Sequence, residues 1–353
     1  MVARKLSTIR NCCAPRGSRS NNPIEGRTTL AQQQLSFGFT VPQRGVFFGI
    51  SSWPEMIALA AEADRNPRFD SIWVGDSVMA KPRPESIALL GALASATRRT
   101  KLGVGCMASF PIRDPILFAY QWSTLDLISQ GRMLLAVCTG IVAGGVSARE
   151  GGVWGITDGQ RGNRMAESIE ICRRLWTEDN VSFTGKYRSF SDVTIHPRPV
   201  QRPCPIWIAA NPPPQMAEKP LRRVAQIADG WMTVNIFPKL FAANWSKLAQ
   251  YLKDAGKDPA AYPNIAYHNI NINSDRTAAL AESKRFLDEY YGPVFAPPMI
   301  EAWTAAGTPE QCAASLRELA KDGAKSITLR ITGWDQEGQY ERLVNEVLPR
   351  VDL

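Results

Sequence analysis

Few side chains in this sequence of 353 residues could carry out acid–base or metal chemistry. It contains two histidines, His196 and His268, and seven cysteines, which show neither CxxC nor the Cys-to-His spacing of a zinc site. A histidine-rich metal centre is therefore excluded, and no metal-binding residue is predicted. His268 lies in the apolar run IAYHNINI, where it could act as a proton donor if its side chain points into a reaction site.

Aromatic side chains are the second group that could shape a site. The sequence has ten tryptophans, of which Trp53, Trp154 and Trp334 fall in loops or directly after apolar runs. Together with Phe110, these tryptophans are predicted to line an apolar substrate pocket. Such a pocket, with few acid–base groups around it, is typical of enzymes in which a bound cofactor supplies the chemistry.

Positive charge is concentrated near the N-terminus. Residues 1–35 carry six basic side chains against a single acidic one, Glu25, so only +3 of the net charge of +8 belongs to the other residues. These show no basic stripe interleaved with aromatics, which excludes nucleic acid as a partner. No apolar run reaches the roughly 18–20 residues of a membrane helix, so no membrane partner is predicted either.

We expect residues 1–35 to be a disordered basic arm or an upstream start-site extension, with a targeting segment as the weaker alternative, and the protein to be cytoplasmic.

Short apolar runs alternate with longer amphipathic segments from residue 37 to the end. This alternation predicts right-handed βαβ units and a parallel sheet, and eight such units close into a (β/α)8 TIM barrel, an α/β fold with its functional residues at the strands' carboxyl ends. An open doubly wound sheet is less favoured, because no GxGxxG opens a helix after the first strand. The expected strands are 37–41, 71–75, 101–108, 132–140, 205–210, 230–235, 265–272 and 326–331, and the expected helices are 54–65, 85–98, 114–129, 163–177, 218–228, 238–255, 275–291, 309–322 and 336–349.

Two segments interrupt the repeat. Residues 141–162, after the fourth strand, contain seven glycines and few strong helix formers, so they predict a long loop that could act as a lid. Residues 181–204 alternate around a Thr-Gly-Lys turn and predict an inserted β-hairpin. Neither is typical of an interdomain linker, and we therefore predict one domain over residues 36–353.

Six stretches resemble, in the same order, the bacterial luciferase-like flavin-dependent oxidoreductases. None is specific alone, but their collinear order over most of the chain is. The family has a (β/α)8 barrel, in agreement with the fold predicted from the pattern of runs. The stretches are FDSIWVGDS (69–77), KLGVGCMASFPIRDPILFAYQWSTLDLISQGRMLLAVCTG (101–140), RGNRMAESIEICRRLWTEDNVSFTGKYRSF (161–190), PIWIAAN (205–211), ADGW (228–231) and GTPEQCAASLRELAKDGA (307–324).

The resemblance implies a reduced flavin or deazaflavin across the mouth of the barrel, with its ring over the first four strands and its chain toward the fifth. It also implies a non-proline cis peptide bond in the third strand, which the alignment places at Gly105–Cys106. Arg164 matches the arginine at a helix start that contacts the flavin phosphate. The cofactor-binding residues implied in this way are Gly105, Cys106, Met107, Cys138, Thr139, Gly140, Arg164, Ala210 and Asn211.

Two departures from the family pattern bear on the chemistry. Asp76 is followed by Ser77, where most catalytic members have histidine, so the acid–base candidates here are Asp76, Ser77 and His268. Asn211 is followed by Pro212–Pro214, which offer no backbone N–H to a phosphate. The side chains of Asn211, Gln215 and Arg164 would then have to bind that phosphate, or the phosphate is bound weakly, as in an enzyme that takes reduced flavin from a reductase partner.

These features favour a two-component monooxygenase that uses reduced FMN and molecular oxygen on a small organic substrate. The resemblance implies a separate flavin reductase as partner, and a homodimer. One alternative is a hydride-transfer oxidoreductase that uses the deazaflavin coenzyme F-420 (F420), although Ser77 favours FMN. The other is a barrel that binds flavin without catalysis.

Overall fold

The computed structural model describes residues 35–79, 81–140 and 145–351. All of them belong to the larger of the two contact units of the chain, Gln34–Leu353. The arm predicted over residues 1–35 lies outside the described residues except for Leu35.

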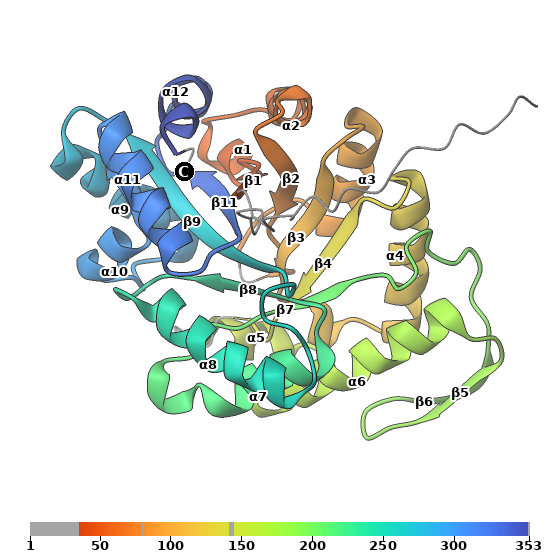
Figure 1. Ribbon diagram of the computed structural model, residues 1–353. Helices are drawn as coiled ribbons and strands as arrows, with labels where there is room; N and C mark the ends of the chain where they lie inside the picture. Colours follow the sequence, from red (N-terminus) through yellow and green to blue (C-terminus); the bar gives the residue numbers. More distant parts are fainter. Residues whose placement is uncertain (1–34, 80, 141–144, 352–353) are drawn as a thin grey trace, which may run out of the picture. The chain divides into compact units, whose positions relative to one another are not determined.

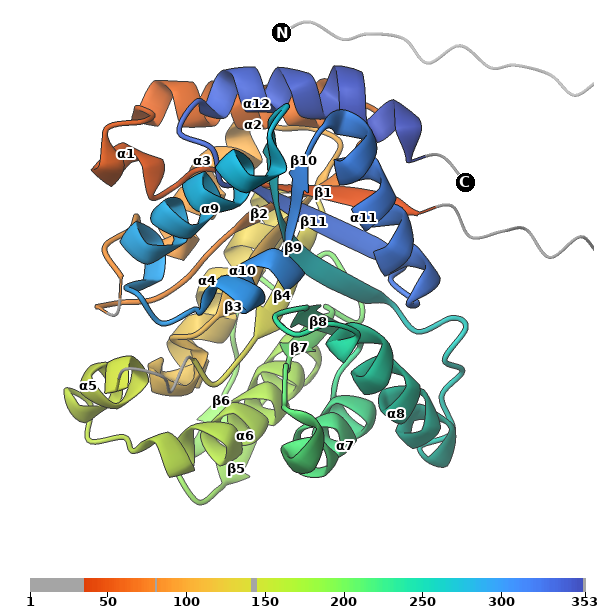
Figure 2. The ribbon, with the colours of Figure 1, turned by 90° about the vertical axis from the view of Figure 1, so that its left-hand side faces the viewer.

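Eight parallel strands of the described residues close into a barrel (Figures 1 and 2). The ring closes because β9 pairs with both β8 and β11, and β11 pairs with β1. The predicted TIM barrel is confirmed, with every expected strand present within a few residues. The strands are β1 Ser36–Thr40, β2 Phe69–Val74, β3 Lys101–Met107, β4 Met133–Val137, β7 Ile206–Ala209, β8 Gly230–Val234, β9 Asn264–Ile272 and β11 Ser326–Ile331.

The helices lie outside the strands and cover the barrel (Figure 1). Several begin at a cap that the sequence encodes: Ser52 and Glu55 form a capping box on α2, and Asp114 accepts from two backbone N–H groups of α4. The last expected helix, 336–349, changes hydrogen-bonding pattern at Leu343. The helices are α2 Trp53–Arg65, α3 Ser86–Ala96, α4 Pro115–Ile128, α6 Asp158–Thr177, α7 Glu218–Ile227, α8 Leu240–Asp254, α9 Arg276–Tyr291, α11 Pro309–Lys321 and α12 Gln336–Arg342.

Two indoles fill the interior of the barrel. Trp73 of β2 and Trp207 of β7 approach to 6.3 Å between ring centroids. Glycines opposite them provide the space: a Cβ on Gly103 would lie 2.3 Å from the Trp73 ring, and one on Gly230 would lie 2.4 Å from the Trp207 ring. The inward face is therefore packed up to the level where the strands end, and a ligand must bind above the indoles.

Elements that the sequence did not predict occur near the carboxyl ends of the strands. β10 Thr304–Gly307 pairs with the second half of β9, beyond the part of β9 that pairs with β8. α1 Gly45–Phe48 and α10 Pro297–Ala302 are short helices. The loop predicted over 141–162 is wrong in part, because α5 Val146–Gly152 lies within it and α6 already begins at Asp158. Residues 141–144 of that loop lie outside the described residues, and its action as a lid stays a prediction. The inserted hairpin is confirmed as β5 Val181–Thr184 and β6 Ser189–Val193.

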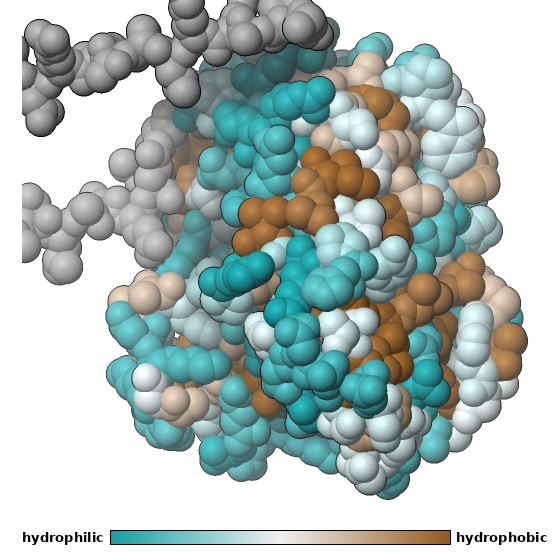
Figure 3. All heavy atoms as spheres, turned by 90° about the vertical axis from the view of Figure 1, so that its right-hand side faces the viewer, coloured by the Kyte–Doolittle hydropathy of each residue, from teal (hydrophilic) through white to brown (hydrophobic). Residues whose placement is uncertain are grey.

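Apolar side chains remain exposed on the outer surface of α4. They are Leu117, Tyr120, Leu127 and Ile128. Figure 3 shows the side of the molecule on which α4 lies, where apolar side chains are interspersed with polar ones.

Within the described ranges, no helix has the length and apolar character needed to cross a bilayer.

Candidate functional site

Asp76 follows β2 and is held rigidly at the mouth of the barrel. Its carboxylate accepts hydrogen bonds from the Ser86 hydroxyl and from the Ser109 backbone N–H, both at 2.7 Å, and lies 3.4 Å from the Arg113 guanidinium. These partners come from α3 and from the loop after β3, so Asp76 fixes two neighbouring loops. A carboxylate with these partners suits a positioning role better than that of a free base.

Ser77 is also engaged by the protein itself. Its hydroxyl donates to the Lys81 carbonyl at 3.1 Å, within the loop after β2. Both predicted residues thus lie at the mouth of the barrel, and both already have protein partners.

The ends of β3 and β4 meet through two thiols. The Gly105–Cys106 peptide bond is cis, at the position that the family resemblance implied. A hydrogen bond between the thiols of Cys106 and Cys138 raises the pKa of Cys106 and lowers that of Cys138. Cys106 packs with the inward-facing residues of the barrel, and Thr139 and Gly140 beyond Cys138 are partly exposed. Met107, in contrast, is fully buried in the outer core between strands and helices.

Arg161 of α6 joins these strand ends from outside the ring. Its guanidinium is fully buried and donates to the carbonyls of Thr139 and Ala108, both at 2.6 Å. It also lies 3.7 Å from the buried carboxylate of Glu150 on α5. Arg161 therefore fixes the ends of β3 and β4 and joins them to α5, a role that its sequence pattern did not predict.

Glu150 extends this network to the loop after β2. Its carboxylate accepts from the backbone N–H groups of Val78 and Met79, at 2.6 and 3.1 Å. The segment after β4 thus holds the segment after β2, and α5 forms around Ala148, Arg149 and Glu150, which are good helix formers although glycines follow them.

Arg164 lies further along its helix than the phosphate prediction assumed. Because α6 begins at Asp158, Arg164 belongs to its second turn and not to the helix start. Its Nε donates to the Pro111 carbonyl at 2.9 Å, and the guanidinium stacks 5.2 Å from the centre of the Tyr187 ring. The premise of a helix-start arginine is therefore wrong, while binding of the cofactor phosphate by Arg164 stays a prediction.

Ala210 and Asn211 follow β7, as expected. The Trp231 indole donates to the Ala210 carbonyl, and the Asn211 side-chain oxygen accepts from the Thr233 hydroxyl. Both residues are partly exposed. The predicted cofactor residues other than Arg164 thus lie at the carboxyl ends of β3, β4 and β7, although the Met107 side chain points into the outer core.

His268 points away from the barrel interior. In β9, Ile265 packs with the inward-facing Trp73, whereas Ala266 and Ile270 belong to the core between strands and helices. Successive side chains of a strand alternate in direction, so His268 shares the outward face with Ala266 and Ile270. Burial lowers the pKa of His268 to about 3, and neither ring nitrogen has a hydrogen-bond partner. The prediction that it serves as a proton donor in the mouth is wrong.

The four aromatic residues predicted for the substrate pocket are not brought together. Phe110 is buried against Phe118 in the outer core, so its assignment to a pocket is wrong. Trp53 and Trp154 are each 45% exposed, on α2 and after α5. Trp334 follows β11 and packs edge-on against Phe48.

A cluster of cations at the mouth was not predicted. We call Arg44, Lys81, Arg83 and Arg330 the mouth cations; they follow β1, follow β2, or lie at the end of β11. Arg44, Arg83 and Arg330 all lie over the Tyr290 ring, with their guanidinium carbons 4.8, 5.4 and 4.7 Å from its centre. Three separate chain segments contribute, so no local pattern in the sequence could have indicated the cluster.

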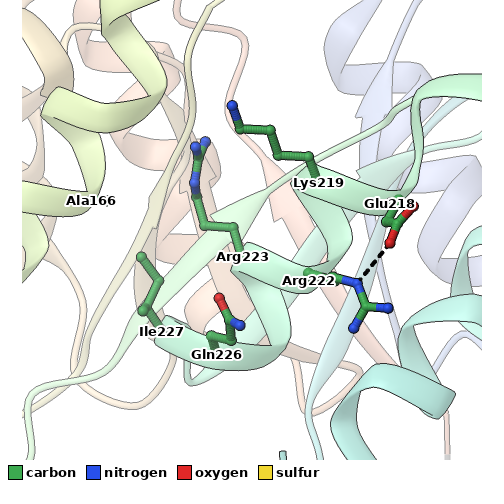
Figure 4. A pocket seen from close by; sticks show the side chains of 7 residues that line it. All are labelled: Ala166, Glu218, Lys219, Arg222, Arg223, Gln226 and Ile227. Atoms are coloured by element: carbon green, nitrogen blue, oxygen red, sulfur yellow. Dashed lines mark hydrogen bonds and ion pairs between the residues drawn. The ribbon is translucent and has the colours of Figure 1, made fainter. Parts of the chain in front are cut away.

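A separate surface pocket of ≈ 500 Å³ lies in the outer helical layer (Figure 4). It is lined by Ala166 of α6 and by residues of α7, among them Lys219 and Arg223. No strand end contributes to it, so we place the candidate site at the barrel mouth and not in this pocket.

Comparison with known proteins identifies the family. The model of the luciferase-like monooxygenase family matches residues 36–326. The chain is 25% identical over 316 residues to an F420-dependent glucose-6-phosphate dehydrogenase of Amycolatopsis mediterranei (strain U-32), covering 80% of this chain and 90% of the relative. It is also 25% identical over 346 residues to a 5,10-methylenetetrahydromethanopterin reductase of Archaeoglobus fulgidus, covering 86% and 99%.

Solved structures share the fold. An F420-dependent secondary alcohol dehydrogenase in complex with an F420–acetone adduct superimposes with a TM-score of 0.74 at 18% identity, covering 91% of this chain and 100% of the other. The monooxygenase RslO1 of Streptomyces bottropensis superimposes with a TM-score of 0.72 at 21% identity, covering 89% and 99%.

Proposed function

Since the chain belongs to the luciferase-like monooxygenase family and is an oxidoreductase of it, we propose that it transfers a hydride between an organic substrate and the deazaflavin F420. The observation that carries this proposal is the agreement of relatives that align with most of the chain. Those from Amycolatopsis mediterranei and Nakamurella multipartita are both named F420-dependent glucose-6-phosphate dehydrogenases. This replaces the FMN monooxygenase as the preferred function.

The residues at the mouth fit a flat, partly apolar ring. Gly105, Cys106 and Ala209 belong to the inward faces of β3 and β7 near their carboxyl ends, yet they are partly exposed, so side chains of the barrel do not cover them. Thr139 and Gly140 extend the same exposed edge at the end of β4. We propose that these residues hold the ring of the cofactor, and that Ala210 and Asn211 border its chain.

When bound there, the deazaflavin supplies the acceptor or donor of the hydride. The protein's part is to hold the strand ends in place, through Arg161 and Asp76, and to orient the substrate. The fully buried position of the Arg161 guanidinium makes this support rigid.

A substrate oxidised at an alcohol carbon also needs a group that exchanges its proton. Our candidate is Tyr290, because its hydroxyl oxygen lies beside the end of β2, 3.4 Å from where a Cβ on Gly75 would stand, next to the Arg83 guanidinium. Burial alone would raise the pKa of Tyr290, but the mouth cations outweigh burial and lower it. Tyr290 thereby replaces His268, and the family's missing histidine, as our candidate for proton transfer.

The FMN-dependent monooxygenase stays the second candidate. Ser77 supports it, because deazaflavin-dependent members of the family usually have histidine after the aspartate that corresponds to Asp76. The flavin reductase and the homodimer remain predictions as well.

Turnover in sealed cuvettes tests the proposal. A panel of alcohols, aldehydes and hydroxy acids is incubated with the protein and oxidised F420 without oxygen, and the loss of the oxidised cofactor's visible absorbance is followed. We expect at least one substrate to reduce F420 under these conditions. Conversion that occurs only with reduced FMN and oxygen would instead establish the monooxygenase.

A further inference from the structure

The mouth cations are surrounded by neutral aromatic rings. Besides Tyr290, Arg330 lies 5.2 Å from the centre of the Tyr291 ring and 5.0 Å from that of Trp303, and Lys81 lies 4.9 Å from the centre of the Tyr291 ring. The hydrogen-bond partners of Arg330 are also uncharged: the Asn269 side-chain oxygen at 2.7 Å and the Tyr291 hydroxyl at 2.7 Å. Aromatic faces stabilise cations, but they do not neutralise them.

Among residues 35–79, 81–140 and 145–351, no carboxylate forms an ion pair with a mouth cation. Two carboxylates in the loops at the mouth already have cationic partners, Asp76 in Arg113 and Glu150 in Arg161. Four positive charges thus converge with no carboxylate paired to them in the described residues; the Tyr290 phenol, whose pKa they lower, could balance only one of them, so the arrangement is costly unless an anion joins them.

Donors in the cluster also lack acceptors. Arg83 Nε and Asn269 Nδ2 are buried, and neither has a hydrogen-bond partner. Buried donors in folded proteins nearly always find an acceptor, so each such atom calls for an explanation. Acceptor oxygens of a bound ligand would satisfy the polar groups and the charges together.

The cluster adjoins the proposed cofactor site but lies across the barrel from the chain of the cofactor. The Lys81 ammonium lies 4.9 Å from the centre of the Tyr291 ring, and the Lys81 carbonyl accepts from the hydroxyl of Ser77, which follows β2. The mouth cations come from β11, β1 and β2, whereas Asn211 follows β7, which lies on the opposite side of the ring from β1.

We propose that the mouth cations bind an oxyanion of the substrate, a carboxylate or phosphate group, and so orient the adjoining carbon toward the cofactor. This inference rests on the proposed function, because it assumes a substrate that enters the mouth beside a bound cofactor. Lys81 and Arg83, both partly exposed, contact the anion first, and the buried Arg44 and Arg330 maintain the positive potential behind them.

Inorganic phosphate is the probe for this site. Protein saturated with oxidised F420 is titrated with phosphate at constant ionic strength by isothermal titration calorimetry. We expect binding to wild type, and a loss of about tenfold or more in affinity for Lys81→Gln and for Arg83→Gln, as for removal of a charged hydrogen-bond donor. Lys81→Arg keeps the charge and should restore binding.

Arg222→Gln is the matched control, because it also removes one positive charge but lies on the exposed surface of α7, paired with Glu218. Its phosphate affinity should equal that of wild type. Equal affinities in all variants, or no binding to wild type, would overturn the proposal. Retained F420 binding in Lys81→Gln and Arg83→Gln shows that these variants are folded.

Competition separates the two sources of an anion. If phosphate and F420 displace each other, the mouth cations hold an anionic group of the cofactor, and assignment to the substrate is overturned. If the protein binds no F420, the proposed function fails, while the same titration of the cofactor-free variants still decides whether the cations form an anion site.

Discussion

Replacing Arg161 by methionine tests how the candidate site is held together. The change removes two hydrogen bonds of 2.6 Å from a charged donor to the carbonyls of Thr139 and Ala108, and leaves the Glu150 carboxylate buried without its cation. Breaking a buried ion pair by removing one partner costs about 3–5 kcal/mol. We therefore expect Arg161→Met to lower the free energy of unfolding in urea by about that amount, because methionine retains most of the volume but donates nothing.

Two further variants make the test of Arg161 specific. Arg174→Met lies on the same helix, but its ion pair with Glu178 is exposed, so the loss should stay below about 1 kcal/mol. In Arg161→Met combined with Glu150→Gln the stranded charge is gone, and the double variant should lose less than the sum of the two single variants. A free energy of unfolding for Arg161→Met within about 1 kcal/mol of wild type would refute the network as described.

Three other substitutions test particular parts of the account. Gly103→Ala should lower the free energy of unfolding in urea by about 2–3 kcal/mol, because its Cβ would lie 2.3 Å from the ring of Trp73. The control Gly159→Ala, which has open space around it, should be neutral or stabilising. Equal effects of the two substitutions would contradict the packing described for Trp73. His268→Leu should keep turnover, and loss of turnover would return His268 to the mechanism. In wild type, the free energy of unfolding should fall as the pH is lowered from 6.5 toward about 3, because the buried neutral imidazole takes up a proton on unfolding. This pH dependence should be weaker in His268→Leu. Tyr290→Phe should lower kcat about 100-fold or more, measured with the substrate that the panel identifies, and should leave the affinity for F420 unchanged. An unaltered kcat would remove Tyr290 from proton transfer.

The barrel could be predicted from the sequence because its signals are local and repeated. Each strand is a short apolar run, and helices such as α2 and α4 begin at side chains that cap them. β10 has only the four small residues of Thr304–Gly307, and its pairing with the second half of β9 is a tertiary feature that its own sequence does not encode.

The site was harder to predict, for reasons that particular residues show. Arg161 and Arg164 stand three positions apart in RGNRM, and the choice between them depends on where α6 begins, which local pattern placed five residues too late. β9 is buried on both faces, so its sequence does not reveal that His268 points outward. The mouth cations come from three distant segments and meet only in the folded barrel.

Equilibrium binding of F420 and FMN tests the central claim most directly. Both cofactors are titrated, oxidised and reduced, under air-free conditions into wild type and into Cys106→Leu, whose larger side chain would occupy the proposed position of the ring. We predict that wild type binds F420 at least about tenfold more tightly than FMN, a difference of about 1.4 kcal/mol, and that Cys106→Leu weakens this binding. Tighter binding of FMN, or binding of neither cofactor, would contradict the account.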